Sequence, residues 1–191
     1  MKEDKKMRII AGEYRSRVLK AASGNHTRPT TDKIKEAIFS RIGPYFSEGI
    51  MLDLFAGSAG IGLEAISRGI EKVYFVDHHI KAIHTIKENI RSLNVEKQCV
   101  IWKMDYKKAL QLAHEEKLRF HIIFLDPPYQ VYSFADILAF IDEHNLLQED
   151  GYLICESAKE EQFEDHYHHF KKVKEAVYGI TRITYYKGEK R

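Results

Sequence analysis

Short apolar segments alternate with longer segments of helical spacing between residues 50 and 156. A short apolar run bounded by turn residues indicates a buried strand, and apolar residues at every third or fourth position indicate a helix. The predicted strands are 50–55, 72–77, 99–104, 121–126 and 152–156, and the predicted helices are 60–68, 80–93, 107–116 and 134–144. This alternation predicts an α/β fold, in which a Rossmann-like, mostly parallel sheet is covered by helices on both faces.

The pattern changes at both ends of the chain. Residues 7–20 predict two short β segments, and they are followed by a helix that Thr31 or Asp32 can cap. At the other end, residues 170–178 and 180–186 predict two further β segments joined by a tight turn. We expect these two segments to form a hairpin that adds an antiparallel strand to one edge of the sheet.

The composition excludes several classes of protein. A hydrophobic content of 44% and a charged content of 30% are typical of a soluble globular protein. No apolar run approaches the roughly 20 residues that span a membrane, and the N-terminus lacks the apolar stretch of a signal peptide. Cys99 and Cys155 lie in apolar surroundings without Cys-x-x-Cys spacing. We therefore expect a cytoplasmic protein whose two cysteines are reduced core residues.

The net charge of +2 is unevenly distributed along the chain. Residues 1–41 contain eleven Lys and Arg against five Asp and Glu, whereas the remaining residues are mildly acidic. A basic arm on an acidic body predicts contact with a polyanion, although a solvated strand face is the alternative interpretation. The predicted phosphate-binding residues are Arg8, Arg15, Arg17, Lys20 and Arg28.

Residues 52–62 read as a strand, a glycine-rich turn and a helix start, which is the general device for binding a nucleotide cofactor. A dinucleotide site prefers Gly-x-Gly-x-x-Gly, but this loop offers Gly57-x-Ala59-x-x-Gly62, with a methyl group where a pyrophosphate would approach. Asp53 lies just upstream, where an acid opposes a pyrophosphate and suits the α-ammonium group of S-adenosylmethionine. The loop therefore favours S-adenosylmethionine as the cofactor.

Two more acids end the next two predicted strands. Asp77 follows Gly57 at the spacing expected for a ribose contact, and Asp105 is suited to accept a hydrogen bond from the adenine amine. The alternative is that these acids only form ordinary turns. The predicted cofactor contacts are Asp53, Phe55, Ala56, Gly57, Ser58, Ala59, Gly60, Asp77, His78, Asp105, Tyr106 and Thr30.

The tetrapeptide Asp126-Pro127-Pro128-Tyr129 follows the apolar run of the fourth predicted strand. Proline fixes its own φ and keeps the preceding residue extended, so the Asp126 carboxylate and the Pro127 carbonyl become fixed acceptors facing outward. Two such acceptors suit the exocyclic amine of a nucleobase, and Tyr129 can stack on the extruded ring. We predict Asp126, Pro127, Pro128 and Tyr129 as catalytic residues, which by themselves would serve guanine or adenine equally.

Four segments resemble the RsmD-type 16S ribosomal RNA guanine-N2 methyltransferases, a branch of the class I S-adenosylmethionine-dependent methyltransferases. They are residues 7–12 (Met-Arg-Ile-Ile-Ala-Gly), 28–37 (Arg-Pro-Thr-Thr-Asp-Lys-Ile-Lys-Glu-Ala), 52–69 and 126–129. The chain departs from this family at Ala59, where the family usually has glycine.

The resemblance implies a function, a partner and a domain organisation. It implies methylation of the N2 amine of one guanine in 16S ribosomal RNA, within the small ribosomal subunit or its assembly intermediate. We expect residues 46–191 to form the methyltransferase catalytic domain as one compact unit. Residues 1–45 would then form a basic β extension and a helix that leads into it.

Other interpretations of the same residues remain open. An adenine-N6 methyltransferase also uses Asp-Pro-Pro-Tyr, a protein glutamine methyltransferase would have asparagine at position 126, and a non-catalytic RNA-binding assembly factor could keep the fold. Glu156, at the end of the fifth predicted strand, is either structural or part of the base pocket. The histidines at positions 78, 79, 84, 166, 168 and 169 are not matched by cysteines or by acids at ligand spacing, so we expect no metal.

Overall fold

The computed structural model describes residues 7–21, 30–128 and 133–190. Two of the predicted site residues, Arg28 and Tyr129, lie outside these ranges. Among the described residues, no helix is both long and apolar enough to cross a lipid bilayer.

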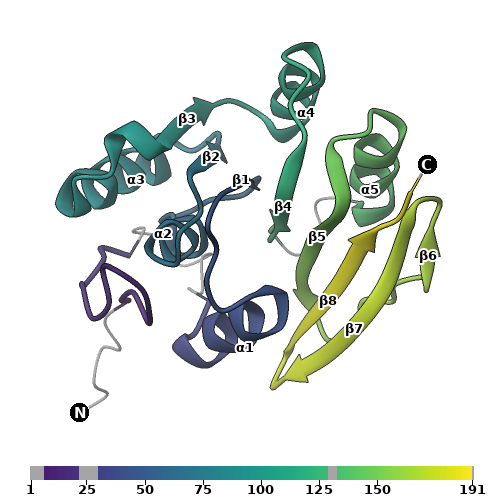
Figure 1. Ribbon diagram of the computed structural model, residues 1–191, viewed down its shortest axis with the longest axis horizontal. Coiled ribbons are helices and arrows are strands. Elements are labelled where there is room, and N and C mark those ends of the chain that lie inside the picture. Colours follow the sequence, from purple (N-terminus) through teal and green to yellow (C-terminus); the bar gives the residue numbers. More distant parts are fainter. Residues whose placement is uncertain (1–6, 22–29, 129–132, 191) are drawn as a thin grey trace.

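One sheet forms the centre of the structure (Figure 1). Within the described ranges its eight strands are β1 (Ile50–Asp53), β2 (Lys72–Asp77), β3 (Cys99–Lys103), β4 (Phe120–Leu125), β5 (Leu147–Ala158), β6 (His166–Tyr167), β7 (Phe170–Tyr178) and β8 (Thr181–Gly188). Their order across the sheet is β3-β2-β1-β4-β5-β8-β7-β6. Strands β1 to β5 are parallel, and β8, β7 and β6 each run antiparallel to the preceding strand in this order. The predicted α/β fold with a C-terminal hairpin is confirmed.

Five α-helices of the described chain cover the two faces of the sheet (Figure 1). They are α1 (Asp32–Ile42), α2 (Gly60–Ser67), α3 (Ile80–Leu93), α4 (Tyr106–Glu115) and α5 (Phe134–Glu143), and a short 3₁₀ helix, η1 (Glu96–Gln98), precedes β3. Apolar residues of α1, α2 and α3 pack on one face, and those of α4 and α5 pack on the other. The alternation of side chains along each strand supplies both cores.

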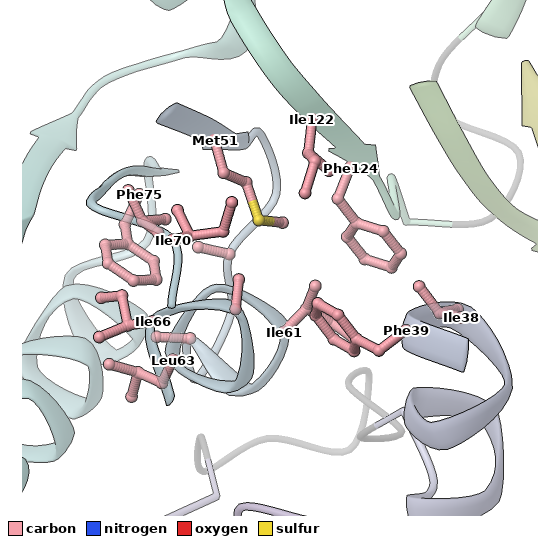
Figure 2. Packing of buried hydrophobic residues seen from close by; sticks show 14 of the residues in the cluster. Ile38, Phe39, Met51, Ile61, Leu63, Ile66, Ile70, Phe75, Ile122 and Phe124 are labelled. Carbon is pink, nitrogen blue, oxygen red and sulfur yellow. The ribbon is translucent and has the colours of Figure 1, made fainter. Parts of the chain in front are cut away.

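The core on the first face joins the sheet to α1 and α2. Figure 2 shows Met51, Ile122 and Phe124 of the sheet pointing toward Ile61 of α2 and Phe39 of α1. These side chains are buried, and each such burial contributes about 1.5–3 kcal/mol. This packing fixes α1, and the chain that enters it, beside the carboxyl ends of the parallel strands.

The strand β5 begins earlier than the predicted range 152–156. Asp150 has a φ of 60°, in the left-handed region, so Asp150-Gly151 forms an irregularity inside a strand where the sequence suggested a turn. The register between β4 and β5 shifts at the same place, between Phe120 and Ile122. A bulge of this kind uses the same residue types as a turn, and only the neighbouring strand distinguishes the two.

The predicted N-terminal β extension is reduced in the described residues to one β-bridge between Arg8 and Val18. Backbone hydrogen bonds still join its two sides, from Ile9 N to the Arg17 carbonyl at 2.9 Å and from Leu19 N to the Met7 carbonyl at 2.8 Å. The backbone N–H groups of Ile10 and Ala11 donate to the carboxylate of Glu64 in α2, at 2.8 and 3.0 Å, and so attach the extension to the helix.

Candidate active site

A cavity of about 860 Å³ opens at the carboxyl ends of the five parallel strands. Each of these strands contributes one acid to its lining, at or near the point where the strand leaves the sheet: Asp53, Asp77, Asp105, Asp126 and Glu156. The ends of neighbouring parallel strands meet at one edge of the sheet, which is why acids far apart in sequence share this cavity.

The glycine-rich turn shapes the cofactor half of this cavity. Gly57 has a φ of 55° and Ala59 a φ of 66°, so both adopt the left-handed conformation between β1 and α2. Ala59 is fully buried in the core and does not line the cavity, whereas the other eleven predicted cofactor contacts do. A Cβ atom at Gly62 would lie 2.3 Å from the Phe75 ring, so this glycine lets α2 pack closely against β2.

The three acids of the cofactor half also hold the backbone around them. The carboxylate of Asp53 accepts from Gly62 N at 3.2 Å, that of Asp77 from Gly57 N at 3.0 Å, and that of Asp105 from Lys107 N at 2.9 Å. Asp53 is 2% exposed, and burial raises its pKa to about 7 against the opposing hydrogen bond from Gly62. A buried carboxyl group with a raised pKa becomes more acidic when a cation binds beside it.

Two aromatic rings lie beside these acids. The centroids of Phe55 and Tyr106 are 5.6 Å apart, and both side chains line the cavity. Aromatic faces of this kind suit the flat ring of an adenine. The structure thus brings together the residues that were predicted from three separate loops.

The other half of the cavity contains Asp126 and Glu156. Burial raises the pKa of Asp126 well above its ordinary range, and the negative charges of Glu156 and Asp53 raise it further. Glu156 is 6% exposed, and its Oε2 accepts a hydrogen bond from Thr30 Oγ1 at 2.8 Å. Burial also raises the pKa of Glu156, and the hydrogen bond from Thr30 opposes that shift. Pro127 is buried and Pro128 is exposed, and both line the cavity.

The turn between β7 and β8 also lines this half, which no pattern in the sequence indicated. Tyr178, Gly179, Ile180 and Thr181 reach the cavity because β8 pairs directly with β5. Tyr178-Gly179 carries a turn signal, but its place beside Glu156 depends on the strand order across the sheet.

The predicted phosphate-binding residues that the structure describes lie outside the cavity, on the surface of the N-terminal arm, which we define as residues 7–21. Arg8 pairs with Asp32 at 2.9 Å, Lys20 pairs with Glu88 at 2.9 Å, and Arg17 donates to the Ser92 carbonyl. Arg15 is exposed on the same arm.

A buried ionic cluster connects this arm to the helices. Glu64 is fully buried and accepts from Arg68 Nε at 2.8 Å, with Lys35 Nζ 3.8 Å away. Arg68 also donates to Glu36 at 2.8 Å. The Lys35 ammonium donates to the Arg8 carbonyl, so the cluster joins the arm, α1 and α2. Glu64 and Arg68 belong to the 52–69 segment that carried the family resemblance, and their role is this junction.

Asp77 lies near two histidines, contrary to the expectation that no acid matches them. The ligand atoms of Asp77, His78 and His79 all lie within 4.8 Å of one another. Both oxygens of Asp77 already accept backbone N–H groups, from Gly57 and His79, and both histidines are exposed.

Comparison with known proteins defines the family. The family model described as "Conserved hypothetical protein 95" matches residues 7–187. The chain belongs to this family. The match to the conserved hypothetical protein 95 family runs from the N-terminal arm into the last residues of β8, so it includes the ionic cluster, the cofactor loop and the whole cavity.

Two relatives and one solved structure agree with this assignment. The chain is 44% identical over 181 residues to the Bacillus subtilis (strain 168) protein named "Putative rRNA methyltransferase YlbH", covering 95% of this chain and 98% of that protein. It is 32% identical over 158 residues to "Ribosomal RNA small subunit methyltransferase D" of Haemophilus influenzae, covering 81% and 80%. A conserved hypothetical protein of Streptococcus pyogenes superposes with a TM-score of 0.77 at 35% identity, over 81% of this chain and 95% of that one. The resemblance to RsmD-type proteins is confirmed.

Proposed function

We propose that this protein transfers a methyl group from S-adenosylmethionine to the exocyclic N2 amine of a guanine in 16S ribosomal RNA. The observation that carries the proposal is the pair of fixed acceptors at Asp126 and Pro127, in one cavity with the three acids of the cofactor half. The names of the relatives in Bacillus subtilis and Haemophilus influenzae support ribosomal RNA as the substrate.

The cofactor half fits a cationic ligand. Among the described residues, no Lys or Arg forms an ion pair with Asp53, Asp126 or Glu156, although all three carboxyl groups have raised pKa values. A dinucleotide, with its negative pyrophosphate, would add to this negative charge. S-adenosylmethionine supplies an electrophilic methyl group on a positively charged sulfur, together with a positive α-ammonium group.

Asp53, Asp77 and Asp105 each have a distinct role in holding this cofactor. Asp53 would attract the α-ammonium group, directly or through a water molecule. Asp77 would accept from the ribose hydroxyls, and Asp105 would accept from the adenine amine, with the rings of Phe55 and Tyr106 beside the base. These roles follow the order of β1, β2 and β3 across the sheet.

The catalytic half would align the base. The lone pair of the guanine amine is delocalised into the ring, which makes the nitrogen a poor nucleophile. An Asp126 oxygen and the Pro127 carbonyl would accept both N–H bonds and direct the lone pair toward the methyl carbon. Alignment of two reactants contributes up to about 7–11 kcal/mol in the best model systems.

Asp126 would also stabilise the positive charge that develops during the transfer. Positive charge develops on the amine as the new C–N bond forms and the C–S bond breaks, and the Asp126 carboxylate stabilises that charge. The methylated nitrogen then loses one proton to Asp126 or to water. A raised pKa makes Asp126 a competent acceptor for this proton.

The N-terminal arm would hold the RNA. Its exposed cations, with Arg15 among them, suit phosphate contacts that carry little sequence information. We therefore expect the small ribosomal subunit or its assembly intermediate, in the cytoplasm, to be the partner that determines which guanine reaches the cavity.

Labelling of small subunits tests this proposal. Subunits from a strain that lacks the gene are incubated with the purified protein and methyl-labelled S-adenosylmethionine, and the RNA is digested to nucleosides. We expect the label in N2-methylguanosine with the wild type and with Asp136→Ala, which alters an exposed acid of α5, and its loss with Asp126→Ala, which removes the acceptor oxygen. Label in N6-methyladenosine would overturn the guanine assignment, and no label in RNA would overturn the enzyme assignment.

A further inference from the structure

We propose that Glu156 makes the site selective for guanine by accepting a hydrogen bond from N1–H of the base. This inference rests on the proposed function, and it concerns a residue that the chemistry of methyl transfer does not itself require.

The sheet places Glu156 beside the catalytic acid. Strands β4 and β5 are parallel neighbours, and Leu125 pairs with Cys155 in their register. The residues that follow, Asp126 and Glu156, therefore lie next to each other. Leu125 and Cys155 pack in the core beneath α4 and α5, so the next residue on each strand faces the opposite side, toward the start of α1.

Glu156 is buried but only partly satisfied. Thr30 Oγ1 donates to Oε2, and among the described residues no donor is found for the other oxygen, Oε1. Glu156 is only 6% exposed, and its Oε1 remains accessible to solvent from the cavity. A base that displaces this solvent must bring a donor for Oε1, or it leaves the carboxylate with a single hydrogen bond. The cavity into which it faces also contains the two acceptors that would hold the N2 amine.

The Watson–Crick edge of guanine supplies that donor. Guanine carries N1–H next to its N2 amine, so it presents neighbouring donors to the neighbouring acceptors Glu156 and Asp126. Adenine presents a lone pair at N1, next to its own amine, and an ionised carboxylate can only accept hydrogen bonds. Burial raises the pKa of Glu156, and the positive charge of S-adenosylmethionine bound in the same cavity would favour the ionised form. A base of the adenine type would leave Glu156 unpaired and facing another acceptor. Asp126 and Pro127 alone cannot make this distinction, because they contact only the amine.

Thr30 has a positioning role in this scheme. Its hydroxyl group donates to Oε2 of Glu156, which lies 126 positions later in the sequence, and this hydrogen bond leaves Oε1 for the base. The substitution Glu156→Gln keeps the size of the side chain and an oxygen for Thr30, but the glutamine amide group presents a donor to the base. This substitution therefore changes the one property on which the selection of guanine depends.

The test compares two bases at the methylated position. Once labelling has identified the nucleotide, small subunits are reconstituted with RNA that carries either guanine or 2-aminopurine there. The 2-aminopurine base keeps the 2-amino group but has an acceptor at N1. Methyl transfer is measured as kcat/KM for the wild type, Glu156→Gln and the control Glu161→Gln, which alters an exposed acid beyond β5.

We expect the wild type and Glu161→Gln to prefer guanine by about 10- to 100-fold, the range for leaving one buried polar group unpaired. Glu156→Gln should lose or reverse that preference, because its oxygen stays with Thr30 and its NH2 group then pairs with N1 of 2-aminopurine but opposes N1–H of guanine. The missing O6 of 2-aminopurine affects all three proteins equally and cancels when their preferences are compared. The inference would be overturned if Glu156→Gln preferred guanine as strongly as the wild type does, with a cofactor affinity that calorimetry shows to be unchanged.

A second pair of variants keeps the test decisive if Glu156→Gln folds poorly. Thr30→Val removes the hydroxyl group and should reduce the guanine preference, whereas Thr30→Ser should retain it. Equal preferences in these two variants would count against the inference. If the wild type does not methylate guanine RNA at all, the proposed function itself fails, which is a separate outcome.

Discussion

The substitution Glu64→Ala should destabilise the fold by about 3–5 kcal/mol, the cost of removing one partner from a buried ion pair. Glu64 is fully buried and accepts from Ile10 N, Ala11 N and Arg68 Nε at 2.8–3.0 Å. Its removal leaves the Arg68 and Lys35 cations buried beside one another and two backbone donors without their acceptor. Such a loss is a large part of the roughly 5–15 kcal/mol that stabilises an ordinary domain.

Urea unfolding measures this effect directly, from the shift of the midpoint at constant slope. Glu36→Ala is the matched control, because Glu36 also pairs with Arg68 but its side chain is 53% exposed. An exposed pair contributes at most about 1 kcal/mol. The arm should also become sensitive to protease in Glu64→Ala. A loss below about 1 kcal/mol, or one equal to that of Glu36→Ala, would refute the argument that this cluster holds the arm.

Three further predictions concern the cofactor half and the arm. Because the pKa of Asp53 is raised to about 7, the folded protein holds a proton that the unfolded chain releases near pH 4. The contribution of Asp53 to stability should therefore fall as pH rises from about 4 to about 7. Without cofactor, Asp53→Asn should unfold at a higher urea concentration than the wild type at pH 8, but not at pH 4. Ala59→Gly should change stability by less than about 1 kcal/mol, because relief of the left-handed conformation offsets the lost methyl and the added chain entropy. Its calorimetric affinity for S-adenosylmethionine should match the wild type, since Ala59 does not line the cavity, and a weaker affinity would contradict this placement. Arg15→Ala should reduce the salt dependence of small-subunit binding by about one unit of slope, and an unchanged slope would exclude Arg15 as a phosphate contact.

The repeating part of the fold could be predicted because its signals are local. The ranges 72–77, 80–93 and 170–178 are the same in sequence and structure, since alternation and helical spacing are properties of neighbouring residues. The acids at strand ends could be predicted as one site, because a parallel sheet brings the carboxyl ends of its strands together.

The remaining features depend on contacts between distant segments. Nothing near Thr30 in sequence indicates that it bonds to Glu156, and nothing near Ile10 indicates that its N–H group bonds to Glu64. Lys35 lies on a helix where a lysine is expected to be solvated, yet it is buried because Glu64 and the Arg8 carbonyl receive its ammonium group. A pattern in the sequence cannot reveal such partners, because each contact forms only when the helices have packed together.

Methylation of guanine N2 in 16S ribosomal RNA through Asp126 is the central claim. Mass spectrometry of nucleosides from purified 16S ribosomal RNA tests it most directly, in a deletion strain that carries the wild-type gene, Asp126→Ala or no gene. We predict that the wild type restores one N2-methylguanosine per RNA that the deletion removes, and that Asp126→Ala at equal protein level does not. An N2-methylguanosine content that is unchanged by the deletion, or restored equally by Asp126→Ala, would contradict the account.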